Sequence, residues 1–310
     1  MSQALAFVFP GQGSQHLGML AELAEQYPVI QETFTEASQA LGYDLWSLVQ
    51  QGPEEELNKT EITQPALLCA GVALWRLWQQ RGGAEPALMA GHSLGEYTAL
   101  VCAGAIEFAD GVRLVQLRGR LMQQAVPAGT GAMAAILGLD DAAIAAACES
   151  AAQGQVVSPV NFNCPGQVVI AGEKAAVERG MEACKAAGAK RAIPLPVSVP
   201  SHCALMRPAA EQMAPALADI TLSLPQIPVL QNVDAGVPAT VEQIRHNLLA
   251  QLYSPVLWTR TVQAMLDQGA ETLVECGPGK VLSGLNKKVS RTLNVVAINE
   301  PDGLAKALGE

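Results

Sequence analysis

The stretch that most constrains the fold, residues 87–97, has the sequence Ala-Leu-Met-Ala-Gly-His-Ser-Leu-Gly-Glu-Tyr. A short apolar run enters the pentapeptide Gly-x-Ser-x-Gly and a helical segment follows, which is the context of a nucleophile elbow in an α/β protein. Such a sharp turn exposes the Oγ of Ser93 above the sheet and leaves no room for side chains at Gly91 and Gly95. The turn also aims the first N–H groups of the helix at the nucleophile, so the N–H of Leu94 is a candidate oxyanion donor. The alternative, a chance pentapeptide in an ordinary loop, is disfavoured by the strand and helix that flank it.

The composition is that of a globular protein without a membrane span. Half of the 310 residues are hydrophobic and 15% are charged, so the chain can bury a sizeable core. The longest apolar run, 65–75, is too short to cross a bilayer, and the first residues do not resemble a secretory signal. Seven cysteines without a Cys-x-x-Cys pair argue against a disulfide framework, so a cytoplasmic location is expected and no metal site is predicted.

The net charge of −10 argues against general affinity for nucleic acids. That affinity depends on clusters of Lys and Arg that neutralise phosphates, whereas this chain has 19 basic and 29 acidic residues. Any anionic partner must therefore meet a local basic surface.

The first strand and the loop after it provide a second candidate oxyanion donor. Residues 5–9 form a continuous apolar run that ends at Pro10, which is typical of a strand buried on both faces of a parallel sheet. The loop 11–15 lacks the third glycine of a dinucleotide-binding loop, because His16 occupies that position, and it lacks the Lys-Ser/Thr pair of a P-loop. In Gly-x-Ser-x-Gly enzymes a separate strand-to-helix loop supplies the second N–H to the oxyanion. We assign that role to the backbone N–H of Gln12.

A helix predicted over 110–125 carries an arginine among its apolar residues. At about 100° per residue its leucines and valine share one face, and Arg118 falls inside that apolar arc. A guanidinium keeps its charge, so it requires an anionic partner or a water-filled cleft. The sequence leaves two alternatives open: a structural ion pair with a core carboxylate, or an arginine that lines a ligand-binding cleft.

The order of the expected elements indicates an α/β fold in two parts. Helices are expected over 20–80, and strand candidates at 227–232, 272–276 and 294–298 alternate with helices. Residues 127–197 predict the order β-α-β-β-α-β, which is the ferredoxin-like arrangement. Its strands are expected at 131–139, 155–163, 167–171 and 191–197, and its helices at 140–152 and 174–187. We therefore expect a small domain, 127–197, inserted into a main domain formed by 1–126 and 198–310.

A serine needs a positioned base to become a nucleophile, and histidine is the usual base. His92 is adjacent to Ser93, so its side chain should point away from the nucleophile while still lining the pocket. His16 is expected to begin a helix and face solvent, and His246 lies in the polar part of an amphipathic helix. His202 is the preferred base, because it lies where the chain re-enters the main domain, and domain junctions commonly hold ligand sites.

The group that orients the base is not identified by this reasoning. Asp110, Asp140 and Asp141 lie between Ser93 and His202, which is the chain order of the α/β-hydrolases. The latter two belong to the expected inserted domain, so none of the three is selected.

Seven motifs taken together identify the chain as similar to one family. These motifs and their order along the chain resemble those of the malonyl-CoA:acyl carrier protein transacylases of bacterial type II fatty-acid synthesis. The resemblance extends over nearly the whole chain. The motifs are Phe-Pro-Gly-Gln-Gly-Ser-Gln at 9–15, Gly-His-Ser-Leu-Gly-Glu-Tyr at 91–97, Arg118, Pro-Ser-His at 200–202, Asn-Val-Asp at 232–234, Gln-Leu-Tyr-Ser-Pro-Val at 251–256 and Gly-Pro-Gly-Lys at 277–280.

The resemblance implies a hydrolase-like core with a mostly parallel sheet, a ferredoxin-like insert, and a two-step transfer. Ser93, deprotonated by His202, would attack the malonyl thioester of coenzyme A, and the phosphopantetheine thiol of the carrier protein would then take the malonyl group. The N–H groups of Gln12 and Leu94 would hold the oxyanion. The backbone carbonyl of Gln251 would orient His202 in place of a carboxylate. No permanently bound cofactor is implied, since coenzyme A enters as part of the substrate.

The family also implies how the acyl group is recognised. Arg118 would bind the free carboxylate of the malonyl group, with Gln12 and His92 beside it. The competing interpretation is a serine thioesterase or hydrolase, which shares the elbow, base and oxyanion donors. A third possibility is a scaffold that binds the carrier protein without turnover, but it leaves the Ser93 elbow unexplained.

Two basic pairs are candidates for docking an acidic carrier protein. Lys190 and Arg191 end the expected inserted domain, and Lys287 and Lys288 follow the Gly-Pro-Gly motif. Because the whole chain is acidic, a local basic surface would have to oppose the net repulsion. The alternative is that these are ordinary solvated ends of secondary-structure elements.

Overall fold

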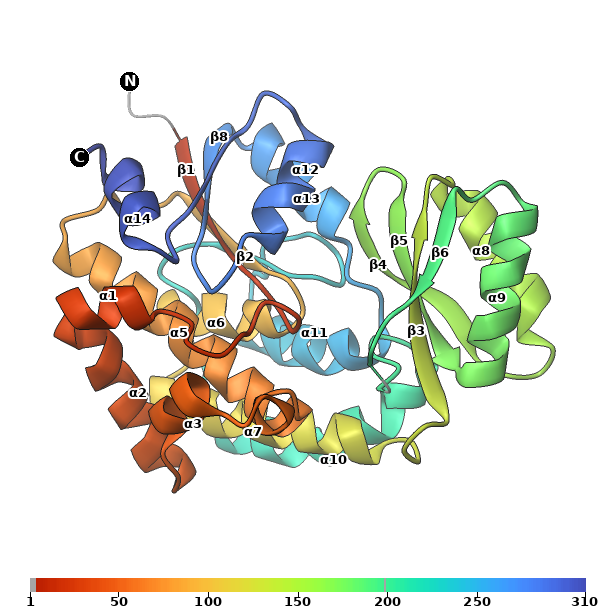
Figure 1. The fold of residues 1–310 in the computed structure, drawn as a ribbon, viewed down its shortest axis with the longest axis horizontal. Helices are drawn as coiled ribbons and strands as arrows, with labels where there is room; N and C mark the ends of the chain where they lie inside the picture. Colours follow the sequence, from red (N-terminus) through yellow and green to blue (C-terminus); the bar gives the residue numbers. More distant parts are fainter. Residues whose placement is uncertain (1–3, 198) are drawn as a thin grey trace.

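The computed structural model describes residues 4–197 and 199–310, and these form two β-sheets (Figure 1). The larger sheet has the strand order β7-β2-β1-β8-β9, and every pair of neighbours in it is parallel. Its strands are β1 (Ala4–Phe9), β2 (Leu88–Gly91), β7 (Val229–Leu230), β8 (Ala270–Glu275) and β9 (Asn294–Ala297). A parallel sheet flanked by helices confirms the predicted α/β class.

Both faces of the larger sheet are buried. In β1, Phe7 and Phe9 pack into the core on one side of the sheet, whereas Ala6 and Val8 pack into the core on the other. Successive side chains of a strand point to opposite faces, so a strand covered on both sides needs an apolar residue at every position. This explains the continuous apolar run at 5–9.

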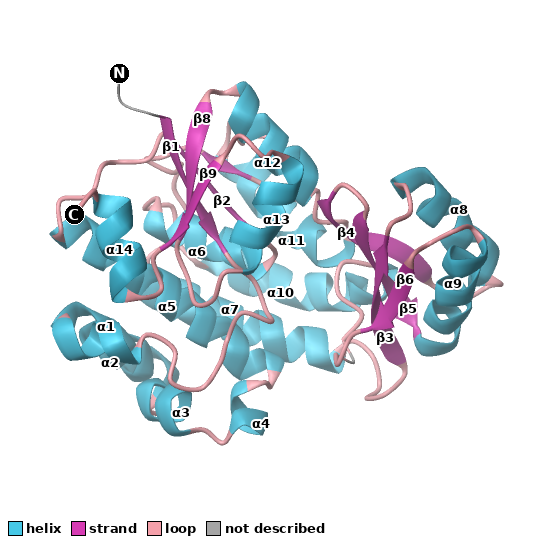
Figure 2. Cartoon of the chain, turned by 45° about the horizontal axis from the view of Figure 1, so that its top comes forward, coloured by secondary structure: helices cyan, strands magenta, loops and turns pink. Residues whose placement is uncertain are grey.

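Helices cover the two faces unequally. One face packs against α12 (Trp258–Asp267) and α13 (Val281–Val289). The other packs against a larger group, and Figure 2 shows the strands lying between these layers. That group contains α1 (Ala21–Gln26), α2 (Pro28–Leu41), α3 (Leu45–Gln51), α4 (Glu54–Leu57), α5 (Thr60–Gln80), α6 (Leu94–Cys102), α7 (Phe108–Gln124), α10 (Arg207–Asp219), α11 (Val241–Tyr253) and α14 (Pro301–Leu308).

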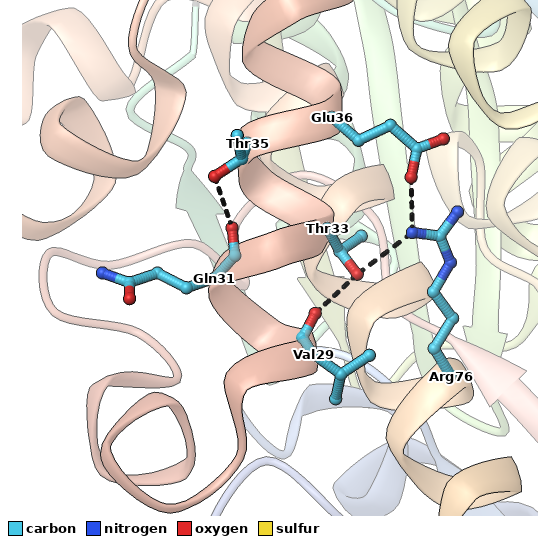
Figure 3. Close-up of polar contacts among 6 residues, drawn as sticks. All are labelled: Val29, Gln31, Thr33, Thr35, Glu36 and Arg76. Carbon is cyan, nitrogen blue, oxygen red and sulfur yellow. Dashed lines mark hydrogen bonds and ion pairs between the residues drawn. The ribbon is translucent and has the colours of Figure 1, made fainter.

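Helix α5 is buried along most of its length, and α2 packs beside it. Arg76 near its C-terminal end donates to Thr33 Oγ1 at 3.2 Å and pairs with Glu36 at 2.6 Å (Figure 3). The Thr33 hydroxyl in turn donates to the carbonyl of Val29 at 2.7 Å. These contacts satisfy the one cation that ends the long apolar run. No helix in the described ranges has both the length and the apolar character of a membrane span.

The smaller sheet is antiparallel and has the strand order β4-β5-β3-β6. Its elements follow one another as β-α-β-β-α-β, and two helices pack on the face that points away from the larger sheet (Figure 1). They are β3 (Gly131–Leu137), α8 (Asp141–Ala152), β4 (Val157–Cys164), β5 (Gln167–Glu173), α9 (Lys174–Ala186) and β6 (Arg191–Pro194).

The other face of the smaller sheet packs toward the rest of the chain. Met133, Val160 and Val169 form an apolar cluster there with Cys203, which belongs to the segment before α10. The edge strand β4 is also joined to the segment between α11 and α12, because Val256 exchanges backbone hydrogen bonds with Val160 and Phe162. The expected boundary between 197 and 198 falls beside a residue outside the described ranges.

Three local predictions were wrong, and one of them is the strand expected at 191–197, which ends at Pro194. His16 does not begin a helix, because the chain makes a turn there and α1 begins at Ala21, although the side chain is exposed as expected. The strand expected at 227–232 has only the two residues of β7, since it pairs at the sheet edge with Met89 and Ala90 alone.

Candidate active site

The turn between β2 and α6 holds Ser93 in a backbone conformation that L-residues rarely adopt, with φ 52° and ψ −109°. The glycines on either side permit this turn. A Cβ on Gly91 would lie 1.8 Å from the carbonyl carbon of Gly95, and a Cβ on Gly95 would lie 2.0 Å from the carbonyl oxygen of Phe9. The elbow therefore packs backbone against backbone at the carboxyl end of β1.

His202 faces Ser93 from the segment that follows the smaller sheet. Its Nε2 lies 2.8 Å from the Ser93 Oγ, and its Nδ1 lies 2.7 Å from the carbonyl oxygen of Gln251. Because a carbonyl can only accept, Nδ1 carries the proton and Nε2 is free to accept the serine proton. His202 itself has a positive φ of 66°, and its N–H donates to the carbonyl of Leu252 at 3.0 Å. Sequence reasoning without the family resemblance looked for a carboxylate here, whereas the observed partner of Nδ1 is a backbone carbonyl.

The pKa of His202 is lowered to about 3, mainly because burial disfavours the imidazolium and further because the Arg118 guanidinium is positive. We expect the NMR signal of this ring, assigned with the His202→Ala variant, to keep its neutral position as the pH is lowered from about 8 to about 5. A titration midpoint at about 6.5, the value of an unperturbed histidine, would contradict this prediction.

Since the unfolded chain binds this proton below about pH 6.5 and the folded chain does not, the free energy of unfolding should fall as the pH drops through that range.

Arg118 is 1% exposed and lies beside the nucleophile. Its Nη1 donates to Gln64 Oε1 at 2.9 Å, and its Nη2 donates to Gln251 Oε1 at 2.8 Å and to Ser93 Oγ at 3.3 Å. The Nε has no acceptor within the described ranges. No ion pair found in those ranges includes Arg118, and Glu96 acts on it only at longer range. The expected alternative of a structural ion pair with a core carboxylate is therefore not found in the described residues.

A close approach of two helices explains the position of Arg118. A Cβ on the next residue, Gly119, would lie 2.5 Å from the carbonyl oxygen of Thr60 at the start of α5. Helices α5 and α7 can therefore touch backbone to backbone here, which brings Gln64 of α5 within reach of the guanidinium.

The backbone N–H groups of Gln12 and Leu94 have no acceptor among the residues that the structure describes. Leu94 begins α6, so its N–H is one of the unpaired donors of a helix N-terminus. Gln12 is brought to the elbow because the loop after β1 lies against it: a Cβ on Gly11 would lie 2.6 Å from the carbonyl oxygen of His92. Both Gln12 and Leu94 line the same cavity as Ser93.

That cavity has a volume of about 240 Å³ and lies between the two sheets. Ser93, His202 and Arg118 line it from the main body, and Met133 and Val197 line it from the side of the smaller sheet. A nucleophile, a neutral base, two free N–H donors and a buried cation thus meet in one place. This is the arrangement required for acyl transfer through a serine ester.

A family model described as "Acyl transferase domain" matches residues 6–299. The chain belongs to the acyl transferase family. This match covers the elbow, the base, the arginine and both sheets.

Named relatives within the acyl transferase family match almost the whole chain. The "Malonyl CoA-acyl carrier protein transacylase" of Escherichia coli K12 is 67% identical over 98% of both chains, and that of Bacillus subtilis is 46% identical over 98% of this chain and 96% of its own. A solved acyl carrier protein S-malonyltransferase of Vibrio cholerae has a TM-score of 0.96 at 64% identity and covers 97% of this chain and 99% of its own. A malonyl-transacylase solved in complex with a type II PKS acyl-carrier protein has a TM-score of 0.98 at 63% identity and covers 99% of both chains.

His92 lines the cavity of this acyl transferase without contacting the nucleophile through its ring nitrogens. Its Nε2 lies 2.8 Å from Asn163 Oδ1, and its ring lies 5.5 Å from the Trp258 ring. Burial lowers the pKa of His92, so the ring is neutral and Nε2 donates to the amide oxygen. His246 is exposed, and His16 lines a separate cavity.

Several polar side chains at the site were not assigned a role from the sequence. Gln64 binds the arginine, Asn163 binds His92, and Asn232 binds the backbone of Ser93. Asn232 and Glu96 belong to motifs that carry the family resemblance, which was the only available signal for them. Clusters of three or more His, Cys, Asp or Glu suited to a metal ion are absent from the described ranges.

Proposed function

We propose that this acyl transferase moves the malonyl group from malonyl-CoA to the phosphopantetheine thiol of an acyl carrier protein through a malonyl-serine at Ser93. The observation that carries the proposal is the Arg118 guanidinium, which is buried 3.3 Å from the nucleophile and has no ion-pair partner among the described residues. Among the described residues its contacts are all neutral: the amide oxygens of Gln64 and Gln251, the Ser93 hydroxyl and the Tyr97 ring. A buried cation with such partners is poorly compensated, and an anionic acyl group would supply the missing charge. Malonyl has a free carboxylate, whereas acetyl and simple fatty acyl groups have none.

The geometry supports a complete first half-reaction. His202 Nε2 takes the proton of Ser93, and the Oγ attacks the thioester carbonyl carbon. The N–H groups of Gln12 and Leu94 hold the oxyanion. When the C–S bond breaks, His202 returns the proton to the sulfur, so coenzyme A leaves as a thiol and the malonyl group stays on Ser93.

The second half-reaction uses the same groups in the opposite order. His202 takes the proton of the carrier protein's thiol, the thiolate attacks the serine ester, and the proton returns to Ser93. The reaction is therefore a ping-pong exchange that needs no bound cofactor.

We place the protein in the cytoplasm, because all seven cysteines are unpaired, as is usual in a reducing compartment. We also propose residues 127–197 as an inserted domain in a core of 1–126 and 198–310.

The two basic pairs proposed for docking flank one turn of the smaller sheet. Lys190 packs over Gly138, because a Cβ on Gly138 would lie 2.6 Å from the Cγ of Lys190. The N–H of Gly138 donates to the carbonyl of Gly166 at 2.8 Å. Next to it, Lys288 donates to Gln167 Oε1 at 3.2 Å. Lys190 and Lys288 therefore lie near the same turn, the one that joins β4 to β5. The full set is Lys190, Arg191, Lys287 and Lys288, all exposed.

Reversing the charges at Lys287 and Lys288 with glutamate should raise KM for the carrier protein by roughly tenfold, with little change in KM for malonyl-CoA, because exposed charges steer association. Steady-state kinetics with each substrate varied in turn would measure this. The matched control is Lys306→Glu, an exposed lysine on α14 at the far side of the molecule (Figure 1). Equal effects on both substrates, or an equal effect of the control, would contradict the docking surface.

The function is tested by mixing the protein with malonyl-CoA in the presence and absence of holo carrier protein and measuring the products by mass spectrometry. We expect malonyl-serine to accumulate without the carrier protein and malonyl-carrier protein to form when it is added. Rapid release of free malonate in both cases would identify a thioesterase instead. Binding of the carrier protein without any acyl-serine would identify a scaffold.

A further inference from the structure

Asn232, the second residue after β7, binds the backbone on both sides of the elbow residue His92 and contacts the backbone N–H of the nucleophile itself. Its Oδ1 accepts the N–H of Ser93 at 2.8 Å, and its Nδ2 donates to the carbonyl of Gly91 at 2.6 Å. The side chain thus satisfies a donor and an acceptor that the sharp turn leaves without backbone partners. Asn232 is fully buried.

A second carboxamide side chain binds the other backbone group of Ser93, its carbonyl. Gln251 Nε2 donates to the carbonyl of Ser93 at 3.0 Å, while Asn232 holds its N–H. Ser93 has a positive φ, a conformation that costs free energy and persists only because surrounding contacts impose it. The two amide side chains supply such contacts.

Glu96, in the first turn of α6, fixes Asn232 in turn. Its Oε2 accepts the backbone N–H of Asn232 at 2.6 Å, and its Oε1 accepts from Gln231 Nε2 at 3.2 Å. The carboxyl is fully buried and forms none of the ion pairs found in the described residues. Burial raises its pKa to about 7, although the hydrogen bonds from residues 231 and 232 and the charge of Arg118 act in the opposite direction.

We propose that Asn232, held by Glu96, is a positioning residue that fixes the nucleophile elbow for the acyl transfer proposed above. Neither side chain lines the cavity that holds Ser93 and His202, so neither contacts the substrate there. Their effect acts through the backbone of Ser93. This backbone sets where Oγ lies relative to His202 Nε2, and the Ser93 carbonyl belongs to the same peptide group as the Leu94 N–H. A shift of this peptide would disturb attack and oxyanion binding together.

The first test compares Asn232→Leu with wild type in single-turnover acylation of Ser93 by malonyl-CoA, followed by intact-mass spectrometry. We expect the acylation rate constant to fall roughly 100-fold, since small misplacements of reacting groups have effects of this size. KM for malonyl-CoA should change by less than about threefold, because Asn232 lies outside the cavity. Circular dichroism and thermal melting establish that the variant is folded.

The second test uses Asn232→Asp, whose neutral acid form reproduces the amide: its O–H can donate to the Gly91 carbonyl and its C=O can accept from Ser93. The ionised form presents an oxygen to the Gly91 carbonyl and repels it. The charged groups near this position are Glu96 on α6, Arg118 on α7 and His202, which stays neutral until about pH 3. If the carboxyl introduced at position 232 ionises in this range, the acylation rate constant of the variant relative to wild type should rise at least roughly tenfold as the pH is lowered from about 8.5 to about 5.5. If the acid form persists at every pH, the rate constant should stay near that of wild type throughout.

The matched control is a second buried glutamate with the same kind of contacts. Glu275 accepts the N–H groups of Leu282 and Ser283 at 3.0 and 2.7 Å and does not line the cavity. Glu96→Gln and Glu275→Gln should lower the melting temperature similarly, but only Glu96→Gln should slow acylation, by roughly tenfold.

Three results would overturn the proposal: a folded Asn232→Leu variant that acylates within about threefold of wild type, an Asn232→Asp variant whose relative rate stays low at every pH value, or equal acylation by the two glutamine variants. If Asn232→Leu does not fold, the other two comparisons decide. Failure of the wild-type protein to form malonyl-serine would instead refute the proposed function, so the two failures are distinguishable.

Discussion

Replacing His202 with alanine is expected to slow acylation of Ser93 by malonyl-CoA roughly ten-thousand-fold, because a serine and its base act as one unit. In the structure, Nε2 lies 2.8 Å from the Ser93 Oγ and is held in the accepting tautomer by the Gln251 carbonyl. Alanine removes the only base in contact with this hydroxyl among the described residues. Single-turnover mass spectrometry gives the rate, and Ser93→Ala, which has no nucleophile, defines the floor.

The matched comparison is with the other histidines. His92 lines the same cavity, but its Nε2 donates to Asn163, and His16 lines a different cavity. His92→Ala should therefore cost far less than His202→Ala, and His16→Ala should have little effect. If either proved more damaging than His202→Ala, the assignment of the base would be wrong.

The elements of the fold were largely predictable because their signals are local. The apolar run at 5–9 and the β-α-β-β-α-β order between 131 and 194 follow from periodicity and turn residues within short windows. Two of the errors lie where tertiary contacts decide an element's length. The short β7 ends where its pairing with β2 ends, and the strand expected at 191–197 stops at Pro194, the last residue paired with β3.

The candidate site was predictable only in part, for the same reason. Ser93 has a local motif, and Arg118 is conspicuous because a charge on an apolar helix face breaks a pattern. Asn232 carries no charge, lies 139 residues from Ser93, and acts through contacts that exist only after folding. Glu96 reads from sequence as an ordinary acidic residue in the first turn of a helix.

Replacing Arg118 with alanine is expected to lower kcat/KM for malonyl transfer roughly 100- to 1,000-fold. Removal of one partner of a buried charge pair typically costs about 2–5 kcal/mol, because the remaining charge stays desolvated. Within the described residues the guanidinium contacts the amide oxygens of Gln64 and Gln251 but no carboxylate, so a substrate carboxylate would be its anionic partner. Acetyl transfer needs no such partner and should fall much less, so the ratio of malonyl to acetyl transfer, measured with the two coenzyme A esters, is the informative quantity.

Two further variants separate recognition of the substrate from support of the fold. Arg118→Lys keeps the charge but loses the planar fork that can bind a carboxylate through two hydrogen bonds, so it should restore only part of the malonyl preference. Arg76→Ala removes an arginine that already has its carboxylate in Glu36 (Figure 3), so it should leave the ratio unchanged. A folded Arg118→Ala variant that lost malonyl and acetyl transfer in equal proportion would show that Arg118 supports the structure of the site and does not select the acyl group.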